Sequence, residues 1–231
     1  MKLMRSLSCF LILCAALSAQ TAPSPKRIDP SLVPVEESPN LPRVLLIGDS
    51  ISMGYTIPVR ELLKGKANVL RVPGNAGDTA RGITNLDQWL GGKKWDVIHF
   101  NFGLHDLKYL DASGKYVSPD QGKQVALLPQ YEANLRQIVE RLKKTNAKLV
   151  WASTTPVPEG TLGRVKDDEL KYNEVALRVM KEYGVPIDDL HAVVTSGPPD
   201  MQLPKNVHFT KEGYQRLAQS VVASINAGLP H

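Results

Sequence analysis

Residues 44–52 read VLLIGDSIS, a run of four apolar residues that leads into a glycine, an aspartate and a serine. A short apolar run bounded by turn-forming residues is typical of a fully buried strand. A helical pattern over 52–64 follows it directly. Strands that pass into helices are the units from which parallel sheets are built. The stretch therefore predicts an α/β domain in which Ser50 lies at the junction between a strand and a helix.

The same alternation of strand-like and helix-like patterns continues along the chain. Predicted strands cover 44–47, 68–72, 95–102, 148–152 and 185–187, and predicted helices cover 52–64, 79–90, 128–145, 166–183 and 211–227. This order predicts a central parallel sheet with helices on both faces. Such sheets bind ligands beyond the carboxyl ends of their strands, so we expect the chemistry in the loops after Ile47, Val72 and Phe102.

The N-terminal segment has the layout of a secretory signal peptide. In residues 1–19, Lys2 and Arg5 precede an apolar run that ends in small residues. The run is shorter than the roughly 20 apolar residues that span a bilayer. The alternatives are a buried N-terminal helix and, less favoured, a lipid anchor at Cys14, because bulky Leu13 stands where lipoprotein signals have a small residue. We therefore expect a secreted or periplasmic protein without a stable membrane anchor.

Composition limits what the rest of the chain can do. Residues 20–42 are rich in proline, serine and charge and predict a linker or an extended arm, so the folded domain is expected over 43–231. Both cysteines lie in residues 1–19, which excludes a disulfide or thiolate metal site from the domain. The formal net charge is +5 without a clustered basic stripe, so we expect no nucleic-acid partner.

Ser50 is the first candidate for chemistry. At a helix N-terminus, backbone N–H groups and the helix dipole favour negative charge close to the hydroxyl. That position suits a nucleophile whose attack creates an oxyanion beside it. The alternative is that Asp49 or Ser50 only caps the helix, since both residue types are common caps.

His208 is the second candidate. It lies in the stretch LPKNVHFTKEGYQRLA, residues 203–218, just before a terminal helix that Thr210 could cap. A serine hydroxyl needs an adjacent base to attack a carbonyl at neutral pH, and histidine is the usual base. The alternative is a surface or capping histidine.

Four short blocks follow one another in the order found in a known family. They are Gly48-Asp49-Ser50, Gly77-Asp78-Thr79, Gly103-x-x-Asp106 and His208-Phe209. Their order and their positions after successive predicted strands resemble the SGNH (GDSL-like) hydrolases over nearly the whole span 43–226. The resemblance implies a flavodoxin-like three-layer α/β/α sandwich and hydrolysis of acyl esters without a cofactor or a metal.

The resemblance also assigns roles to residues. Ser50 would be the nucleophile and His208 the general base. The oxyanion would be held by the backbone N–H groups of Ser50 and Gly77 together with the side chain of His105. Asp49 and Asp106 would support the site.

Two positions depart from the family pattern. His105 stands where the family has an oxyanion-binding asparagine, and an imidazole N–H can also donate a hydrogen bond. Lys205 stands three residues before His208, where the family has the triad aspartate, and a lysine cannot accept the Nδ1 proton. The acceptor could be a backbone carbonyl, the Asn206 side chain or Asp200. We favour a Ser-His dyad with a backbone carbonyl as the acceptor.

The leading hypothesis for function is an exported esterase that removes acetyl or similar small acyl groups from polysaccharide or glycoside. A lipase, lysophospholipase or arylesterase is the second reading, since one fold serves many esters. A catalytically silent glycan-binding relative is the third, and the substitutions at His105 and Lys205 motivate it. The polar stretch 108–124 predicts a surface insertion near the active face that helps to set substrate choice.

Overall fold

The computed structural model describes residues 28–230, so the predicted signal peptide lies outside the described residues. Five parallel strands form the central sheet, in the order β2-β1-β3-β6-β7. They are β1 (Arg43–Ile47), β2 (Asn68–Arg71), β3 (Val97–Phe100), β6 (Lys148–Ala152) and β7 (Ile187–Asp188). This is the strand order of flavodoxin-like folds, with the second strand outside the first. The predicted parallel sheet is confirmed.

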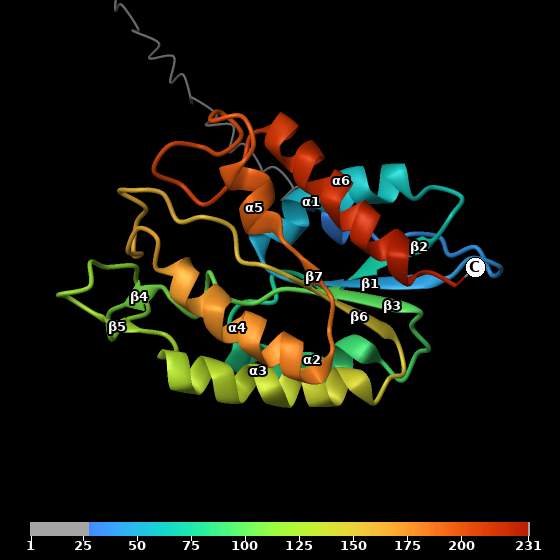
Figure 1. Ribbon diagram of the computed structural model, residues 1–231, viewed down its shortest axis with the longest axis horizontal. Coiled ribbons are helices and arrows are strands. Elements are labelled where there is room, and N and C mark those ends of the chain that lie inside the picture. The colour runs from blue at the N-terminus through green and yellow to red at the C-terminus, as the bar shows by residue number, and fades with distance from the viewer. Residues whose placement is uncertain (1–27, 231) are drawn as a thin grey trace, which may run out of the picture.

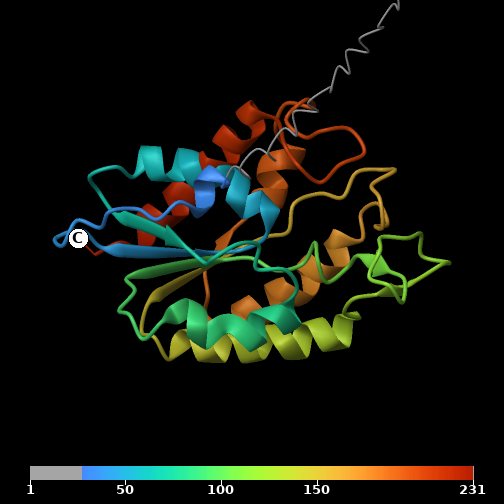
Figure 2. The ribbon, with the colours of Figure 1, turned by 180° about the vertical axis from the view of Figure 1, so that it is seen from behind.

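Helices cover both faces of the sheet (Figures 1 and 2). On one face lie α1 (Ser50–Leu62), α5 (Leu190–Thr195) and α6 (Lys211–Gly228), and on the other lie α2 (Thr79–Leu90), α3 (Leu128–Lys143) and α4 (Glu169–Tyr183). The two groups give the three-layer α/β/α arrangement that the sequence predicts.

The core is built around β1. Val44, Leu45, Leu46 and Ile47 are all at most 1% exposed, because the strand is covered by helices on both faces and flanked by a strand on each side. β1 pairs with β2 along one edge and with β3 along the other. The strand order reverses at β1, because the next strand, β2, lies on one side of it and β3 lies on the other. In sheets of this kind a crevice forms at such a reversal, at the carboxyl edge of the sheet.

Local capping explains where the helices near this edge begin. Asp49, Asp78 and Thr210 precede α1, α2 and α6, and each side chain accepts a hydrogen bond from a backbone N–H of the first turn. These caps satisfy N–H groups that have no partner inside the helix. The predicted stop of the 166–183 helix is confirmed, because Gly184 ends α4 in the left-handed conformation.

Several boundaries and short elements differ from the sequence predictions. α1 begins at Ser50 rather than at 52, because Asp49 already caps it. α4 begins at Glu169 rather than at 166, because Asp167 adopts a positive φ of 60° that interrupts the helix. The antiparallel pair β4 (Tyr109–Leu110) and β5 (Lys123–Gln124) and the 3₁₀ turn Pro30–Leu32 were not predicted, since segments of two or three residues show no periodicity.

The β4-β5 pair belongs to the predicted surface insertion. It projects at the end of the molecule opposite to the C-terminus in both ribbon views (Figures 1 and 2). α1 starts from the carboxyl end of β1 on this same side of the sheet. The insertion therefore stands beside the edge where the sequence predicts the chemistry.

Candidate active site

Ser50 lies where the sequence places it, at the first position of α1 directly after β1. Its side chain is half-buried, whereas the preceding Asp49 is 3% exposed and uses its Oδ1 to accept a hydrogen bond from the Ile51 N–H at 2.9 Å. Asp49 is therefore the residue that caps α1, and the Ser50 hydroxyl is free to bond another partner. Gly48 allows this tight turn, since a Cβ there would meet the Ser52 side chain at 2.9 Å.

That partner is His208, which is 158 residues away in the sequence. Ser50 Oγ and His208 Nε2 are 2.8 Å apart. The loop between α5 and α6 carries His208, and an antiparallel bridge between Gln202 and Phe209 together with a 2.9 Å bond from the Leu203 N–H to the His208 carbonyl holds this loop. The structure thus brings a serine hydroxyl and an imidazole to hydrogen-bond distance, an arrangement in which an imidazole can take the hydroxyl proton.

Asn206 is the acceptor that orients His208. Its Oδ1 lies 2.7 Å from His208 Nδ1 and 3.0 Å from the His208 backbone nitrogen. The backbone N–H can only donate, so the oxygen of the Asn206 amide must face His208. Nδ1 then carries the proton of the neutral imidazole, and Nε2 presents its lone pair to Ser50. The favoured prediction of a backbone carbonyl acceptor was wrong, and the Asn206 alternative matches the structure.

The other two residues considered near His208 do not orient it. Lys205 has a positive φ of 55°, which turns the chain so that the Asn206 side chain folds back onto His208. The Lys205 side chain lines the pocket beside the serine. Asp200 lines a separate surface pocket with Thr210 and Arg216.

The predicted oxyanion donors have different surroundings. The Gly77 N–H donates to Asn75 Oδ1 at 2.8 Å, so this donor is already engaged. His105 lines the same pocket as Ser50 and His208.

Burial and charges of both signs act on His105. Its Nδ1 lies 3.1 Å from the Lys108 Nζ. Burial lowers the pKa of His105, the positive charges of Lys108 and Arg164 lower it further, and Asp49 acts in the opposite direction. His105 is therefore a neutral imidazole at neutral pH, with a single N–H to donate.

Asp106 forms a buried support next to His105. It is 0% exposed, and its Oδ1 accepts hydrogen bonds from the Thr79 N–H at 3.0 Å and the Thr79 hydroxyl at 2.5 Å. Asn134 donates to the same hydroxyl at 3.0 Å. Burial raises the pKa of Asp106 to about 7. Asp106 thereby ties the turn after β3 to the start of α2.

A pocket of about 400 Å³ opens above these groups. Side chains from six segments line it: Asp49, Ser50, Asn75, Leu104, His105, Tyr116, Thr161, Leu162, Arg164, Lys205, Asn206, Val207 and His208. Two of them are cations, Arg164 and Lys205, and Leu162 is an apolar rim residue that is 69% exposed. Tyr116 belongs to the predicted surface insertion 108–124, whereas no sequence pattern pointed to Arg164, which reaches the pocket from an irregular segment.

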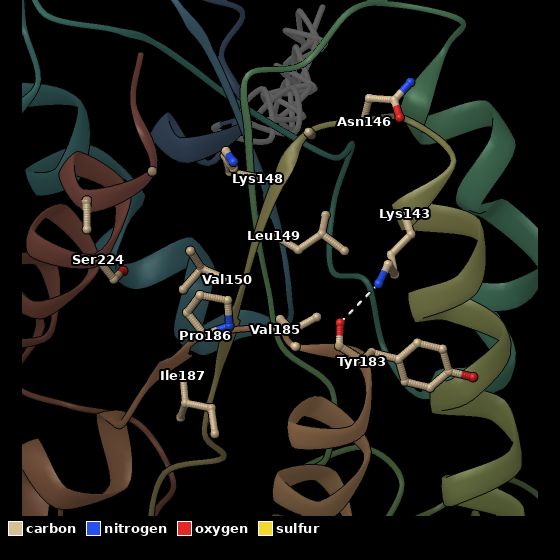
Figure 3. Close-up of a pocket in the computed structure, with 14 residues that line it drawn as sticks. Lys143, Asn146, Lys148, Leu149, Val150, Tyr183, Val185, Pro186, Ile187 and Ser224 are labelled. Carbon is tan, nitrogen blue, oxygen red and sulfur yellow. Dashed lines mark hydrogen bonds between the residues drawn. The ribbon is translucent and has the colours of Figure 1, made fainter. Parts of the chain in front are cut away.

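A larger cavity of about 570 Å³ lies away from Ser50 and His208 (Figure 3). It is lined by the beginning of β6, the turn after α4 and the C-terminal part of α6, and Lys143 donates to the Tyr183 carbonyl there at 3.0 Å. Within the part of the chain that the structure describes, its lining contains no histidine, cysteine or acidic residue. It offers no nucleophile with a base, so the chemistry is assigned to the pocket at Ser50.

Three further features of residues 28–230 bear on function: a buried histidine, the metal-binding potential of the side chains and the length of the helices. His99 is a buried core histidine, and its Nε2 lies 2.9 Å from Asp188 Oδ2. No group of three or more histidine, cysteine or acidic side chains in this range could hold a metal ion. None of the helices in this range is long and apolar enough to cross a membrane.

Comparisons with known proteins identify a family and several solved structures with the same fold. Residues 46–216 match the model of the GDSL-like lipase/acylhydrolase family. A lipase/acylhydrolase from Enterococcus faecalis is similar in structure with a TM-score of 0.68 at 18% identity, covering 82% of this chain and 98% of that one. No curated protein matches the chain.

Two further solved structures share the fold. An acetyl xylan esterase has a TM-score of 0.65 at 16% identity, covering 79% of this chain and 99% of that one. An α/β hydrolase enzyme from the metagenome of Lake Arreo, Spain, has a TM-score of 0.65 at 14% identity, covering 82% and 97% of the two chains.

Proposed function

The chain belongs to the GDSL-like lipase/acylhydrolase family, a family of ester hydrolases, and on that premise we propose that it is a secreted serine esterase that removes acetyl or other small acyl groups from carbohydrate. The observation that carries the proposal is the 2.8 Å contact between Ser50 Oγ and His208 Nε2. The residue span of the catalytic domain is proposed to be 43–231, and the residue roles that follow are part of the same proposal.

Catalysis would proceed through an acyl-enzyme. Ser50 Oγ attacks the ester carbonyl carbon while His208 Nε2 takes the hydroxyl proton. The tetrahedral intermediate then expels the alcohol, which receives that proton from His208. Water, activated by the same imidazole, attacks the acyl-serine, and the carboxylic acid leaves with Ser50 restored.

The negative charge on the intermediate needs hydrogen-bond donors. The Ser50 N–H lies at the N-terminus of α1, where the helix dipole adds to its effect. His105 is the proposed side-chain donor from the pocket wall. The Gly77 N–H can take part only if it exchanges its bond with Asn75 for one with the oxyanion.

The neutral Asn206 fixes the tautomer of His208 but adds no charge to stabilise the imidazolium. A charged acceptor forms a hydrogen bond about twice as strong as a neutral one. We therefore propose a Ser50-His208 dyad with a neutral orienting residue, in which Asp49 caps α1 and Asp106 holds the turn that carries His105.

The pocket supports a small acyl group on a polar alcohol. Its volume is about 400 Å³, and polar or charged side chains such as Asn75, Arg164 and Lys205 contribute to its wall beside a larger apolar area. One similar structure is an acetyl xylan esterase, which makes acetylated polysaccharide a reasonable first class of substrate to test.

A second candidate has its own observation. Leu162 and Tyr116 are 69% and 38% exposed at the pocket rim and could contact a longer acyl chain or an aromatic alcohol. This would favour a lipase, lysophospholipase or arylesterase of the same fold. Acyl-chain-length preference separates the two candidates.

The test is hydrolysis of 4-nitrophenyl acetate, butyrate and dodecanoate by the purified protein. We expect cleavage of the short esters, and loss of that activity in Ser50→Ala and in His208→Ala. Ser224→Ala is the matched control, because Ser224 lines the remote cavity and should leave the rate unchanged. Activity that rises steadily toward dodecanoate would favour the lipase reading, and an inert parent that still binds glycans would favour the silent-binder reading.

Export is a separate part of the proposal. We propose that residues 1–19 direct secretion and are then removed. The intact mass of protein recovered from the periplasm or the medium of a producing bacterium tests this. A mass that still includes residues 1–19 would contradict it.

A further inference from the structure

Lys108 contacts the imidazole of His105 from the turn that follows β3. The Lys108 Nζ lies 3.1 Å from His105 Nδ1. A lysine ammonium has three donors and no acceptor, so Nδ1 must supply the lone pair to this contact. The single proton of neutral His105 is then carried by Nε2.

The surroundings of Lys108 hold its ammonium in place. Its Nζ lies 5.2 Å from the centroid of the Tyr116 ring, and the Arg164 guanidinium lies 5.5 Å from the same centroid. Cations within about 6 Å of an aromatic centroid are attracted to the ring. Arg164 Nε also donates to the Leu104 carbonyl at 3.0 Å, next to His105 in the chain. Two cations and one ring thus fix the segment on which His105 stands.

The tautomer of His105 matters because the ring is neutral. Four charged groups influence its protonation: Lys108 and Arg164 disfavour the imidazolium, as burial does, whereas Asp49 and Asp78 favour it. A neutral imidazole has one donor nitrogen and one acceptor nitrogen. With the opposite tautomer, Nε2 would present a lone pair, and a lone pair repels an oxyanion.

We propose that Lys108 is a positioning residue that fixes the tautomer of His105, so that Nε2–H faces the pocket as an oxyanion donor. This inference rests on the proposed esterase function. It assigns a role to a residue at the start of the surface insertion and explains how a histidine can replace an amide donor in this turn.

The test combines NMR with kinetics on the purified protein. Long-range ¹H–¹⁵N spectra of His105 report which ring nitrogen carries the proton, whether or not the protein is active. We expect Nε2–H in the parent and Nδ1–H in Lys108→Glu, because the new carboxylate can only accept. Lys108→Met should give a mixture of the two tautomers.

The kinetic expectation follows from the tautomer. At pH 8, Lys108→Glu should lower kcat for 4-nitrophenyl acetate about 100-fold, the effect of losing one oxyanion donor, with little change in KM. The ratio of its kcat to that of the parent should rise as the pH falls, because the imidazolium regains the Nε2–H. Lys115→Glu is the matched charge control on the same exposed insertion, and we expect its kcat to stay near that of the parent.

The outcomes separate this inference from the proposed function. If the parent hydrolyses the ester and Lys108→Glu keeps its kcat or its Nε2–H tautomer, the positioning role is overturned while the esterase function stands. A fall in kcat that is independent of pH and is shared by Lys115→Glu would also overturn it, because it would indicate a general effect of charge. A parent that hydrolyses no ester would instead refute the proposed function.

Discussion

Replacing Asn206 by alanine tests whether a neutral side chain can orient His208, the proposed general base. The Asn206 Oδ1 accepts two hydrogen bonds from His208, at 2.7 Å from Nδ1 and 3.0 Å from the backbone nitrogen. A neutral hydrogen bond contributes roughly 0.5–1.5 kcal/mol, so the two together contribute about 1–3 kcal/mol. Alanine removes both, and the imidazole becomes free to rotate or to change its tautomer.

At 1.36 kcal/mol for each factor of ten, this loss corresponds to a fall of about 5- to 150-fold in kcat/KM. The assay is hydrolysis of 4-nitrophenyl acetate at neutral pH. Asn226→Ala is the matched control, because Asn226 is an exposed asparagine near the end of α6. A value for Asn206→Ala within about twofold of the parent and of this control would refute the orienting role.

Asn206→Asp supplies the complementary test. A carboxylate also accepts both bonds and adds a charge that stabilises the imidazolium formed during attack. We expect kcat/KM to be retained or increased, and the acid limb of its pH profile to move to higher pH. A variant as impaired as Asn206→Ala would show that the amide itself, rather than an acceptor oxygen, is required.

Three other predictions follow from contacts around the site. His105→Ala should lower kcat by about 10²–10³ with little change in KM, measured on the same ester; an unchanged kcat would remove His105 from the oxyanion site. Burial raises the pKa of Asp106 from 3.8 to about 7. The contribution of the protonated Asp106 to the free energy of unfolding is therefore fully present below about pH 4 and is lost as the pH rises through 7. Urea denaturation should therefore show the free energy of unfolding of the parent falling relative to Asp106→Asn by at most about 1.4 kcal/mol per pH unit across this window, and parallel profiles would contradict the shift. Gly54→Ala should cost about 1–3 kcal/mol of stability, because its Cβ would lie 2.1 Å from the Tyr214 ring between α1 and α6; a cost below about 0.5 kcal/mol would show that the ring can move.

The sequence predicted the parts of the fold that depend on hydrophobic patterning. The run 44–47 is apolar because both faces of β1 are covered, and the predicted range 79–90 coincides with α2 because Asp78 caps it and Gly91 ends it. The same patterning could not reveal β4 or β5, which have two residues each.

The site was predictable where it depends on position along the strands. Ser50 follows β1, and His208 precedes α6, so topology alone brings both to one edge of the sheet. The residue that accepts the Nδ1 hydrogen bond of His208 could not be predicted in the same way. Lys205 adopts a positive φ just before Asn206, and a lysine at this position does not indicate such a backbone conformation. Arg164 reaches the pocket from an irregular segment 60 residues after the Leu104 carbonyl that it contacts, so only the folded chain reveals it.

The two histidines of the pocket, His208 and His105, have different hydrogen-bond partners at Nδ1, and these partners favour different tautomers. The oxygen of Asn206 accepts from His208 Nδ1, which leaves Nε2 as an acceptor for the serine proton, whereas the Lys108 ammonium donates to His105 Nδ1, which leaves Nε2 as a donor. Protonation therefore has unequal consequences, since an imidazolium cannot serve as a base but still donates from Nε2. We expect the acid limb of kcat/KM to fall tenfold per pH unit, which is the slope for a single protonation, that of His208. A limb that falls a hundredfold per unit would mean that protonating His105 also abolishes catalysis, and it would contradict the assignment of His105 as a simple donor.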